Sequence, residues 1–339
     1  MRQGANPAKA STLAPFKRHR VIVPVYVPSS DGYFRHAAEV LSLCLESLSL
    51  TTRGRASITV VANGCTPDIV EHLQAEFEAG RIHQLVLNRR NWGKIDAALS
   101  MLRGRFEDLL TVADADVLFQ PGWLEAVERV FRAFPECGVV TPSPNPSLAF
   151  AHTTATLLSA WRRRELRYQG VVPEHDLDRF ATSIGRPDYL QPMQRHVQLT
   201  VTRDGQTACV GGGHFVFTMR REVAWQLPSD PSTTALRPFG ESKWFDDPPD
   251  AMGYWRLSTP RAYAYHMGNV PEDWMREALD ACRQTVAPAP AADQPLPAAA
   301  PSAWRRVPLR WRQSLVRLAR KGHFEKRWAR EALAARVHA

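Results

Sequence analysis

Two carboxylates stand one residue apart at Asp114 and Asp116, in the stretch TVADADVLF, where an apolar run of residues ends. Residues two apart in an extended chain point to the same side, so both carboxylates face one place. Burying an ionised carboxylate costs free energy unless the group is paired or binds a metal ion. Hard cations such as Mg2+ and Mn2+ prefer oxygen ligands and readily bridge to phosphates. The pair predicts a metal and phosphate site, and a surface turn that carries two aspartates by chance is the plainer alternative.

The elements around this pair must hold it at the edge of a sheet. Apolar, β-branched segments alternate with segments whose apolar residues recur at helical spacing. The expected strands span residues 20–28, 56–64, 82–88, 107–117 and 137–144, and the expected helices span residues 36–50, 66–80, 92–104 and 121–135. This alternation predicts a parallel sheet with helices on both faces.

Several polar or turn-forming residues follow the ends of these strands. Ligands of such sheets bind beyond the carboxyl ends of the strands. We therefore expect a single crevice at this edge. The residues that it should gather are Pro24, Tyr26, Asn63, Asn91, Asp114 and Asp116.

These segments also form a recognisable series. The stretches VIVPVYVP, ITVVANGCTPDIV, NRRNWGKIDAALSML and LLTVADADVLFQPGWLEAV are followed by GGGHFVFTMRREV, by a Gly–Glu pair, and by AYAYHMGN. In order and spacing the series resembles glycosyltransferase family 2, over roughly residues 20–270. The resemblance implies a GT-A fold, which is an α/β fold with a Rossmann-like, mostly parallel sheet flanked by helices. It also implies a transferase that uses a nucleotide-diphosphate sugar, a UDP-sugar foremost, and a divalent metal, Mn2+ or Mg2+.

The resemblance assigns the metal site to three residues. Asp114 reaches the ribose or the metal, and Asp116 is the direct metal ligand. His266, in AYAYHMGN, is a further contact to the metal or the diphosphate. A histidine that only caps the end of a strand is the alternative for His266.

Further donor contacts are implied at the ends of the first two strands. Pro24 and Tyr26 close the first strand, and Tyr26 could stack on the nucleotide base. Asn63 stands where the family has an acid that binds the base or ribose. This departure leaves the identity of the base open.

Two other segments are implied to border the donor. Asn91 and Lys94 match the family's N-x-G-K pattern, and Lys94 could pair with the diphosphate or orient Asp114. A solvated lysine at the start of a helix is an equal alternative. Gly212, in CVGGGHF, lies in a segment that borders the donor sugar and the acceptor in the family.

An inverting single displacement needs a carboxylate base, and the sequence does not single one out. Ser242 stands where the family has the catalytic aspartate. The nearby candidates are Glu241, Asp246 and Asp247, and we expect Asp247 first. The alternative is that all three are ordinary carboxylates of a loop and that the base lies elsewhere in the chain.

Two other functions stay open. A sugar nucleotidyltransferase shares the alternating core, but it needs a glycine-rich loop after the first strand, where this chain has VPVYVPSSDG. The other is a GT-A domain that has lost its base and serves as a sugar- or nucleotide-binding scaffold. The serine at position 242 favours it, whereas the retained Asp114, Asp116 and His266 argue against it.

We expect five regions along the chain. Residues 20–146 and 147–283 form the donor-binding and the acceptor-binding halves of one GT-A domain. We expect a helix within residues 153–170 of the second half, and loops in the rest of the stretch to residue 208. A glycan, a lipid-linked molecule or a small molecule is the expected acceptor. Residues 1–19 form a flexible arm, and residues 284–303, rich in alanine and proline, form an extended, disordered linker.

The fifth region, residues 304–339, carries the positive charge. It contains eleven Lys and Arg and two Glu, which equals the formal net charge of +9 of the whole chain. The neutral remainder argues against a nucleic-acid partner. We expect a basic amphipathic helix, broken at Gly322, that lies on an anionic membrane or else docks on the protein itself. Its membrane anchors would be Trp304, Trp311, Phe324 and Trp328.

The expected location is cytoplasmic, with membrane association through this tail. The five cysteines are scattered and form no CxxC pair, which is typical of reduced thiols. No apolar stretch is long enough to span a bilayer, and the N-terminal residues lack the apolar core of a secretory signal.

Overall fold

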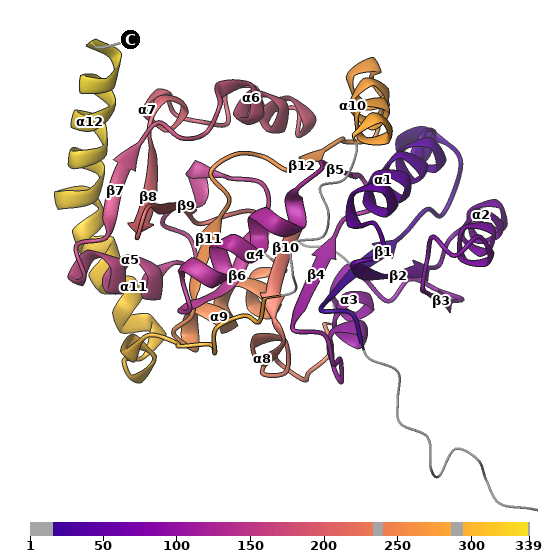
Figure 1. The fold of residues 1–339 in the computed structure, drawn as a ribbon, viewed down its shortest axis with the longest axis horizontal. Helices are drawn as coiled ribbons and strands as arrows, with labels where there is room; N and C mark the ends of the chain where they lie inside the picture. Colours follow the sequence, from indigo (N-terminus) through magenta and orange to yellow (C-terminus); the bar gives the residue numbers. More distant parts are fainter. Residues whose placement is uncertain (1–15, 233–239, 286–293, 338–339) are drawn as a thin grey trace, which may run out of the picture.

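The computed structural model describes residues 16–232, 240–285 and 294–337. A ten-stranded sheet forms its centre, in the order β3-β2-β1-β4-β10-β6-β11-β9-β8-β7 (Figure 1). The strands are β1 His19–Val25, β2 Ala56–Asn63, β3 Gln84–Asn88, β4 Leu109–Ala113, β6 Cys137–Thr141, β7 Leu166–Gln169, β8 Gln198–Arg203, β9 Gln206–Val210, β10 Val216–Arg220 and β11 Trp255–Ser258. A small second sheet pairs β5 Val117–Phe119 with β12 Ala264–His266.

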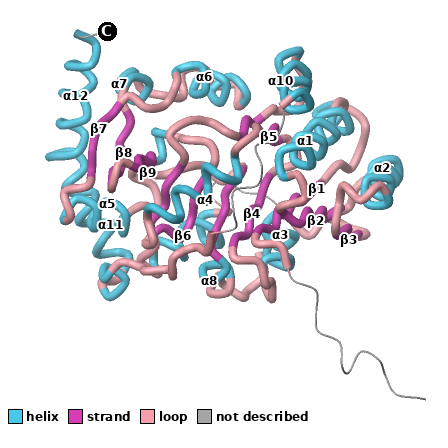
Figure 2. The backbone as a smooth tube through the Cα atoms, in the orientation of Figure 1, coloured by secondary structure: helices cyan, strands magenta, loops and turns pink. Residues whose placement is uncertain are grey.

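Strands β1 to β4 run parallel, as expected, with α1 Ala37–Thr52, α2 Pro67–Glu78 and α3 Lys94–Leu102 between them. Strand β10 lies antiparallel between β4 and β6, which separates two strands that are near neighbours in the sequence. The fold is the expected mostly parallel α/β sheet, with β10 reversed at its middle and antiparallel pairs at the β7 edge. Helices lie around the strands of this sheet (Figure 2).

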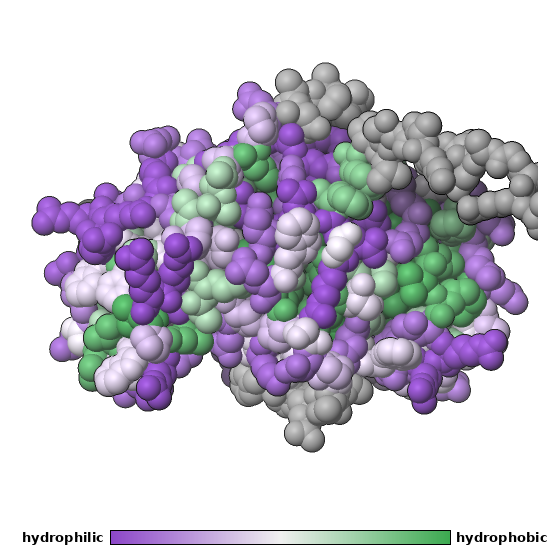
Figure 3. Space-filling view, turned by 90° about the horizontal axis from the view of Figure 1, so that it is seen from below, coloured by the Kyte–Doolittle hydropathy of each residue, from purple (hydrophilic) through white to green (hydrophobic). Residues whose placement is uncertain are grey.

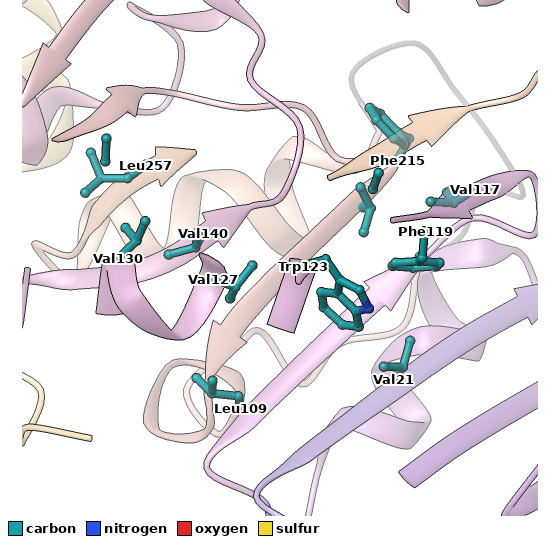
Figure 4. Close-up of a cluster of buried hydrophobic side chains, with 14 of the residues drawn as sticks. Val21, Leu109, Val117, Phe119, Trp123, Val127, Val130, Val140, Phe215 and Leu257 are labelled. Atoms are coloured by element: carbon teal, nitrogen blue, oxygen red, sulfur yellow. The ribbon is translucent and has the colours of Figure 1, made fainter. Parts of the chain in front are cut away.

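Both faces of the sheet are buried, which explains the continuous apolar strands in the sequence. Val21 and Val23 face one hydrophobic cluster, and Ile22 between them faces the other. The first cluster is covered by α1, α2 and α4 Trp123–Ala133, and the second by α3 and α8 Arg221–Ala224. Trp123 is at the centre of the first cluster, beside Phe119 (Figure 4).

The helix expected within residues 153–170 forms as α5 Thr154–Arg162. The expectation of loops beyond it to residue 208 was wrong, because this stretch forms α6 Glu174–Ser183 and α7 Pro192–His196, and strands β7, β8 and β9 extend the central sheet as an antiparallel edge. Short polar strands such as LRYQ lack the apolar alternation that marks a strand in a sequence.

The chain closes with α9 Asp247–Ala251, α10 Asp273–Gln284, α11 Leu309–Ala319 and α12 Glu325–Val337. A π-helical turn at Arg320–Phe324 joins α11 to α12 at the expected break. Residues 1–15 of the expected arm and 286–293 of the expected linker lie outside the described residues. Within the described ranges, no helix has the length and apolar character needed to cross a membrane.

The C-terminal helices pack on the domain. Trp328 is 0% exposed and its Nε1 donates to the carbonyl oxygen of Val197 at 2.8 Å. Arg312 is also fully buried, and its guanidinium donates to the carbonyl oxygens of Asp250, Ala251 and Val307. Phe324 and Trp328 are therefore enclosed in the core, out of reach of a membrane, whereas Trp311 is 60% exposed.

We predict that Trp328→Ala lowers the free energy of unfolding by about 3–5 kcal/mol, because it leaves a cavity in the core. Trp311→Ala is the matched control and should change this free energy by less than about 0.5 kcal/mol. Urea unfolding followed by circular dichroism measures both. Equal, small effects would show that the tail contributes nothing to the fold.

Candidate functional site

A cleft of about 1010 Å³ opens where strands β1, β2 and β4 end. This volume is at the upper end of the range for small-molecule sites. Nine of the residues singled out in the sequence line it: Pro24, Tyr26, Asn63, Asn91, Lys94, Asp114, Asp116, Glu241 and His266. The cleft also takes residues from the second half of the chain, among them Phe180, Tyr189 and His214.

Lys94 links two of the carboxylates that line this cleft. Its Nζ lies 2.5 Å from Oδ1 of Asp114 and 2.6 Å from Oε1 of Glu241. Burial disfavours its charge, but the two carboxylates outweigh burial and raise the pKa of Lys94 above its ordinary value. Burial also raises the pKa of Asp114, to about 6, with the charges of Asp116 and Glu241 adding to the rise and Lys94 opposing it. The positive charge of Lys94 thus partly offsets the negative charges of the carboxylates in this cleft.

Asp116 and His266 form a second pair. Nε2 of His266 lies 3.4 Å from Oδ2 of Asp116, because β12 runs antiparallel to β5 and places His266 opposite Val117. Oδ1 of Asp116 is buried and has no hydrogen-bond partner among the described residues. A carboxylate oxygen left without a partner beside an imidazole suits a divalent metal such as Mn2+.

The protein alone offers an incomplete set of metal ligands. In the described part of the chain, no group of three or more His, Cys, Asp or Glu side chains is arranged to hold a metal ion. Mg2+ and similar ions are commonly held by one or two protein ligands, with substrate phosphates and water completing the shell. Asp116 and His266 fit an ion of this kind.

The side chains of Asn63 and Asn91 are used within the protein. The amide of Asn63 donates to Oδ1 of Asn91 and accepts from Asn88 and from the backbone N–H of Trp92. Gly64, with φ of +82°, lets this loop approach closely, since a Cβ there would lie 2.7 Å from the nitrogen of Asn91. These two asparagines therefore shape the loop at the edge of the cleft.

Tyr26 and Gly212 differ in their access to the cleft. Tyr26 lines the cleft, is 43% exposed and lies perpendicular to the ring of Phe34, so part of its side chain is accessible to a ligand. Gly212 is buried, is absent from the lining of the cleft, and packs where a Cβ would lie 2.1 Å from Oγ1 of Thr141. Its neighbours Gly213 and His214 line the cleft instead.

The three candidate bases have different surroundings. Glu241 lines the cleft and binds Lys94 and His214. Asp247, the first expectation, does not line the cleft; it is 41% exposed and pairs with His152 at 2.7 Å. Asp246 is only 2% exposed and lies behind the cleft. Of the three, only Glu241 lines the cleft.

Asp246 is fixed by cations. Its carboxylate lies 2.9 Å from Nη1 of Arg256 and 3.4 Å from Nδ1 of His214. Burial opposes its charge, yet Arg256 and His214 outweigh burial and hold the pKa of Asp246 well below its usual range. The buried ion pair is thus maintained at neutral pH.

The sequence analysis missed His214, Tyr33 and Tyr189, which also line the cleft. The signal for His214 was its place directly after three glycines and two residues before strand β10. Tyr33 lies in the short 3-10 helix Gly32–Phe34 and Tyr189 in the loop between α6 and α7; neither belongs to a motif, and only the fold brings them to the cleft.

We predict that Arg256→Met lowers the free energy of unfolding by about 3–5 kcal/mol, because Asp246 is left as a buried, poorly compensated charge. The double variant Arg256→Met, Asp246→Asn should recover part of this loss. Urea unfolding at neutral pH tests both. A single variant as stable as the wild type would contradict the assignment of this ion pair.

Comparisons with known proteins identify the family. Residues 34–243, more than half of the chain, match the model described as "Glycosyltransferase like family 2". No curated protein matches the chain.

Two solved structures are similar in part. The mannosyltransferase PcManGT from Pyrobaculum calidifontis, in complex with GDP-Man and Mn2+, has 18% identity, with 96% of this chain and 78% of that chain covered and a TM-score of 0.42. TarS from S. aureus, residues 1–349, has 12% identity and a TM-score of 0.39; the match covers 78% of this chain and 65% of that one. At these scores neither contributes to the assignment. The family match alone is decisive: the chain belongs to glycosyltransferase-like family 2 and is a glycosyltransferase.

Proposed function

We propose that this glycosyltransferase moves a sugar from a nucleotide-diphosphate sugar to an acceptor hydroxyl, with inversion at C1 and with a divalent metal ion. The observation that supports this most is the composition of one cleft. It combines the Asp116–His266 pair, the Asp114–Lys94 pair and the carboxylate of Glu241. A leaving diphosphate needs cations, and an attacking hydroxyl needs a base.

Asp116 and His266 would hold the metal, with the donor's phosphates as further ligands. The metal would neutralise the charge that grows on the diphosphate as it leaves. Lys94 would add a second positive charge there once a diphosphate competes for it. Asp114, freed from Lys94, would then accept a hydrogen bond from the ribose.

Glu241 is the proposed base, in place of Asp247. The acceptor oxygen forms a bond to C1 of the sugar while the bond from C1 to the phosphate oxygen breaks. The electron pair of that bond leaves with the nucleoside diphosphate, and the acceptor's proton passes to Glu241. Its position in the cleft, 16% exposed and bound to Lys94, supports this assignment over the half-exposed Asp247.

The acceptor would lie at the end of the cleft formed by the second half of the chain. Phe180 and Tyr189 line this end, and Oη of Tyr189 accepts from Oγ of Ser147 at 2.7 Å. Aromatic rings that lie beside a hydrogen-bonding hydroxyl group, such as that of Tyr189, suit a sugar or another acceptor that carries hydroxyl groups. A glycan, a lipid-linked molecule or a small molecule fits this description.

We also propose that α11 docks the enzyme on an anionic membrane surface. Trp311, Leu315 and Leu318 form an exposed apolar stripe along one side of this helix. Exposed basic residues flank the stripe, namely Arg310, Arg317 and Lys321. Figure 3 shows hydrophobic residues beside strongly hydrophilic ones at the left end of the molecule, the end where Figure 1 places α11 and α12. This pattern is typical of interfacial helices.

The donor is tested by nucleotide release. With Mn2+ present, we expect UDP release from a UDP-sugar, in a panel that includes GDP- and dTDP-sugars. Asp116→Ala and Glu241→Gln should each lower the rate by at least about 100-fold, because each removes a group that acts in the transition state.

Asp247→Asn is the matched control for Glu241→Gln and should keep most of the activity. Donor binding without release of any nucleotide would favour a sugar-binding scaffold. Full activity of Asp116→Ala, or of the wild type in EDTA, would overturn the metal dependence.

Membrane docking is tested by sedimentation with liposomes. We expect the protein to sediment with vesicles that contain phosphatidylserine and not with pure phosphatidylcholine vesicles. Replacing Trp311, Leu315 and Leu318 together by serine should abolish sedimentation, because the apolar stripe is lost. Leu333→Ser, at an exposed leucine of α12, is the control and should sediment normally. Equal binding of all variants would reject docking through α11.

A further inference from the structure

A group of imidazole, carboxyl and hydroxyl side chains adjoins Glu241 through Oε2, the oxygen other than the one that contacts Lys94. It consists of His214, Asp246, Ser242, His152 and Asp247, which we call the His214 cluster. None of these residues except His214 lines the cleft, and the proposed transfer reaction gives none of them a role.

Contacts within the cluster form a continuous series. Nε2 of His214 lies 3.0 Å from Oε2 of Glu241, and its Nδ1 lies 3.4 Å from Oδ2 of Asp246. Ser242 Oγ donates to the same oxygen of Asp246 at 3.3 Å and lies 3.4 Å from Nε2 of His152. The series ends at Asp247, which is half-exposed.

The backbone of the cluster is unusual at two places. His152 has φ of +55°, a left-handed conformation that costs a residue other than glycine about 1–3 kcal/mol. Ser242–Asp246 forms a π-helical turn, a feature that is frequent at functional sites. These departures hold Ser242 and His152 against Asp246.

As the proposed base, Glu241 must pass on the proton that it takes from the acceptor, and this cluster contains a group that can receive it. A donor and an acceptor in the cleft would cover the part of Glu241 that lines it. A proton taken from the acceptor would then stay on Glu241 until the product leaves. A second proton acceptor within hydrogen-bond reach would return Glu241 to its ionised form while the cleft is still filled.

We propose that His214 takes the acceptor's proton from Glu241, with Asp246 holding the imidazole in the orientation and tautomer that this transfer needs. This proposal rests on the proposed function, in which Glu241 is the base. The hydrogen on Nδ1 is donated to Asp246, which leaves the lone pair of Nε2 directed at Glu241. The O–H bond on Glu241 breaks as the N–H bond on Nε2 forms, and no electrons are transferred between the residues. His214 is a positioning residue for the reaction, since it acts through Glu241.

The charges around His214 predict the pH range in which this works. Burial and Lys94 lower the pKa of His214, but the hydrogen bond to Asp246 and the charges of Glu241 and Asp246 outweigh them and raise it above 6.5. Below this pKa, His214 already carries its second proton and can accept no other. The rate should therefore rise with pH through the raised pKa of His214.

The experiment measures nucleotide release with Mn2+ and the best donor of the panel, from pH 5.5 to pH 9. His214→Gln keeps an amide that can bond to Glu241 and Asp246 but cannot take up a proton. We expect its rate to fall by about 10-fold or more and its acidic limb to move to lower pH. In His214→Ala, added imidazole should restore part of the rate. His323→Ala, at an exposed histidine of the tail, is the control and should behave as the wild type.

The outcomes separate this proposal from the proposed function. If Glu241→Gln is inactive while His214→Gln keeps the wild-type rate and pH profile, His214 has no part in proton transfer and only this inference fails. If Glu241→Gln is fully active, the base itself is wrongly assigned. A His214→Gln variant that is slow but retains the wild-type acidic limb would show a purely structural role and would also overturn the inference.

Discussion

A single ammonium group, that of Lys94, joins the two halves of the cleft. It comes from the first turn of α3 and bonds to Asp114 at the end of β4 and to Glu241, which lies 147 positions further along the chain than Lys94. Two carboxylates brought this close in a buried cleft repel each other unless a cation lies between them. The geometry of the whole site therefore depends on the position of Lys94. A donor diphosphate would compete for the same cation, which ties the arrangement of the cleft to its ligand.

The reversed strand β10 sets which residues can meet at this cation. It runs antiparallel to β4, and the backbone N–H of Asp114 donates to the carbonyl oxygen of Phe215 at 2.7 Å. The residues just before β10 therefore reach the sheet edge where β4 ends, and His214 lies beside Glu241. Had β6 followed β4 directly in the sheet, as in a simple parallel order, this position would have been closed to the second half of the chain.

The second half of the chain supports the site from behind. Arg256 at the start of β11 fixes Asp246, and Arg312 of α11 binds the backbone of α9 through the carbonyl oxygens of Asp250 and Ala251. Through Arg312, the C-terminal helices thus help to hold α9, which follows Asp246 directly in the chain. The charge of the tail and the packing of the tail are largely separate properties. Apart from the buried Arg312, most of its basic side chains are exposed to solvent, while Trp328 and Phe324 fill the core.

The sequence by itself determined the family, the order of the first strands and helices, and the edge of the sheet where Asp114 and Asp116 lie. These features follow from local periodicity and from motifs that are contiguous in the chain. It favoured Asp247 over Glu241 and Asp246 without a physical basis, because the burial and the ion pairs with Lys94, Arg256 and His152 that distinguish the three are not visible in the sequence. It also missed strands β7 to β9, whose polar residues are held by pairing with neighbouring strands rather than by their own pattern. Only the tertiary structure decided which carboxylate faces the cleft, since contacts between residues far apart in the chain determine burial and charge.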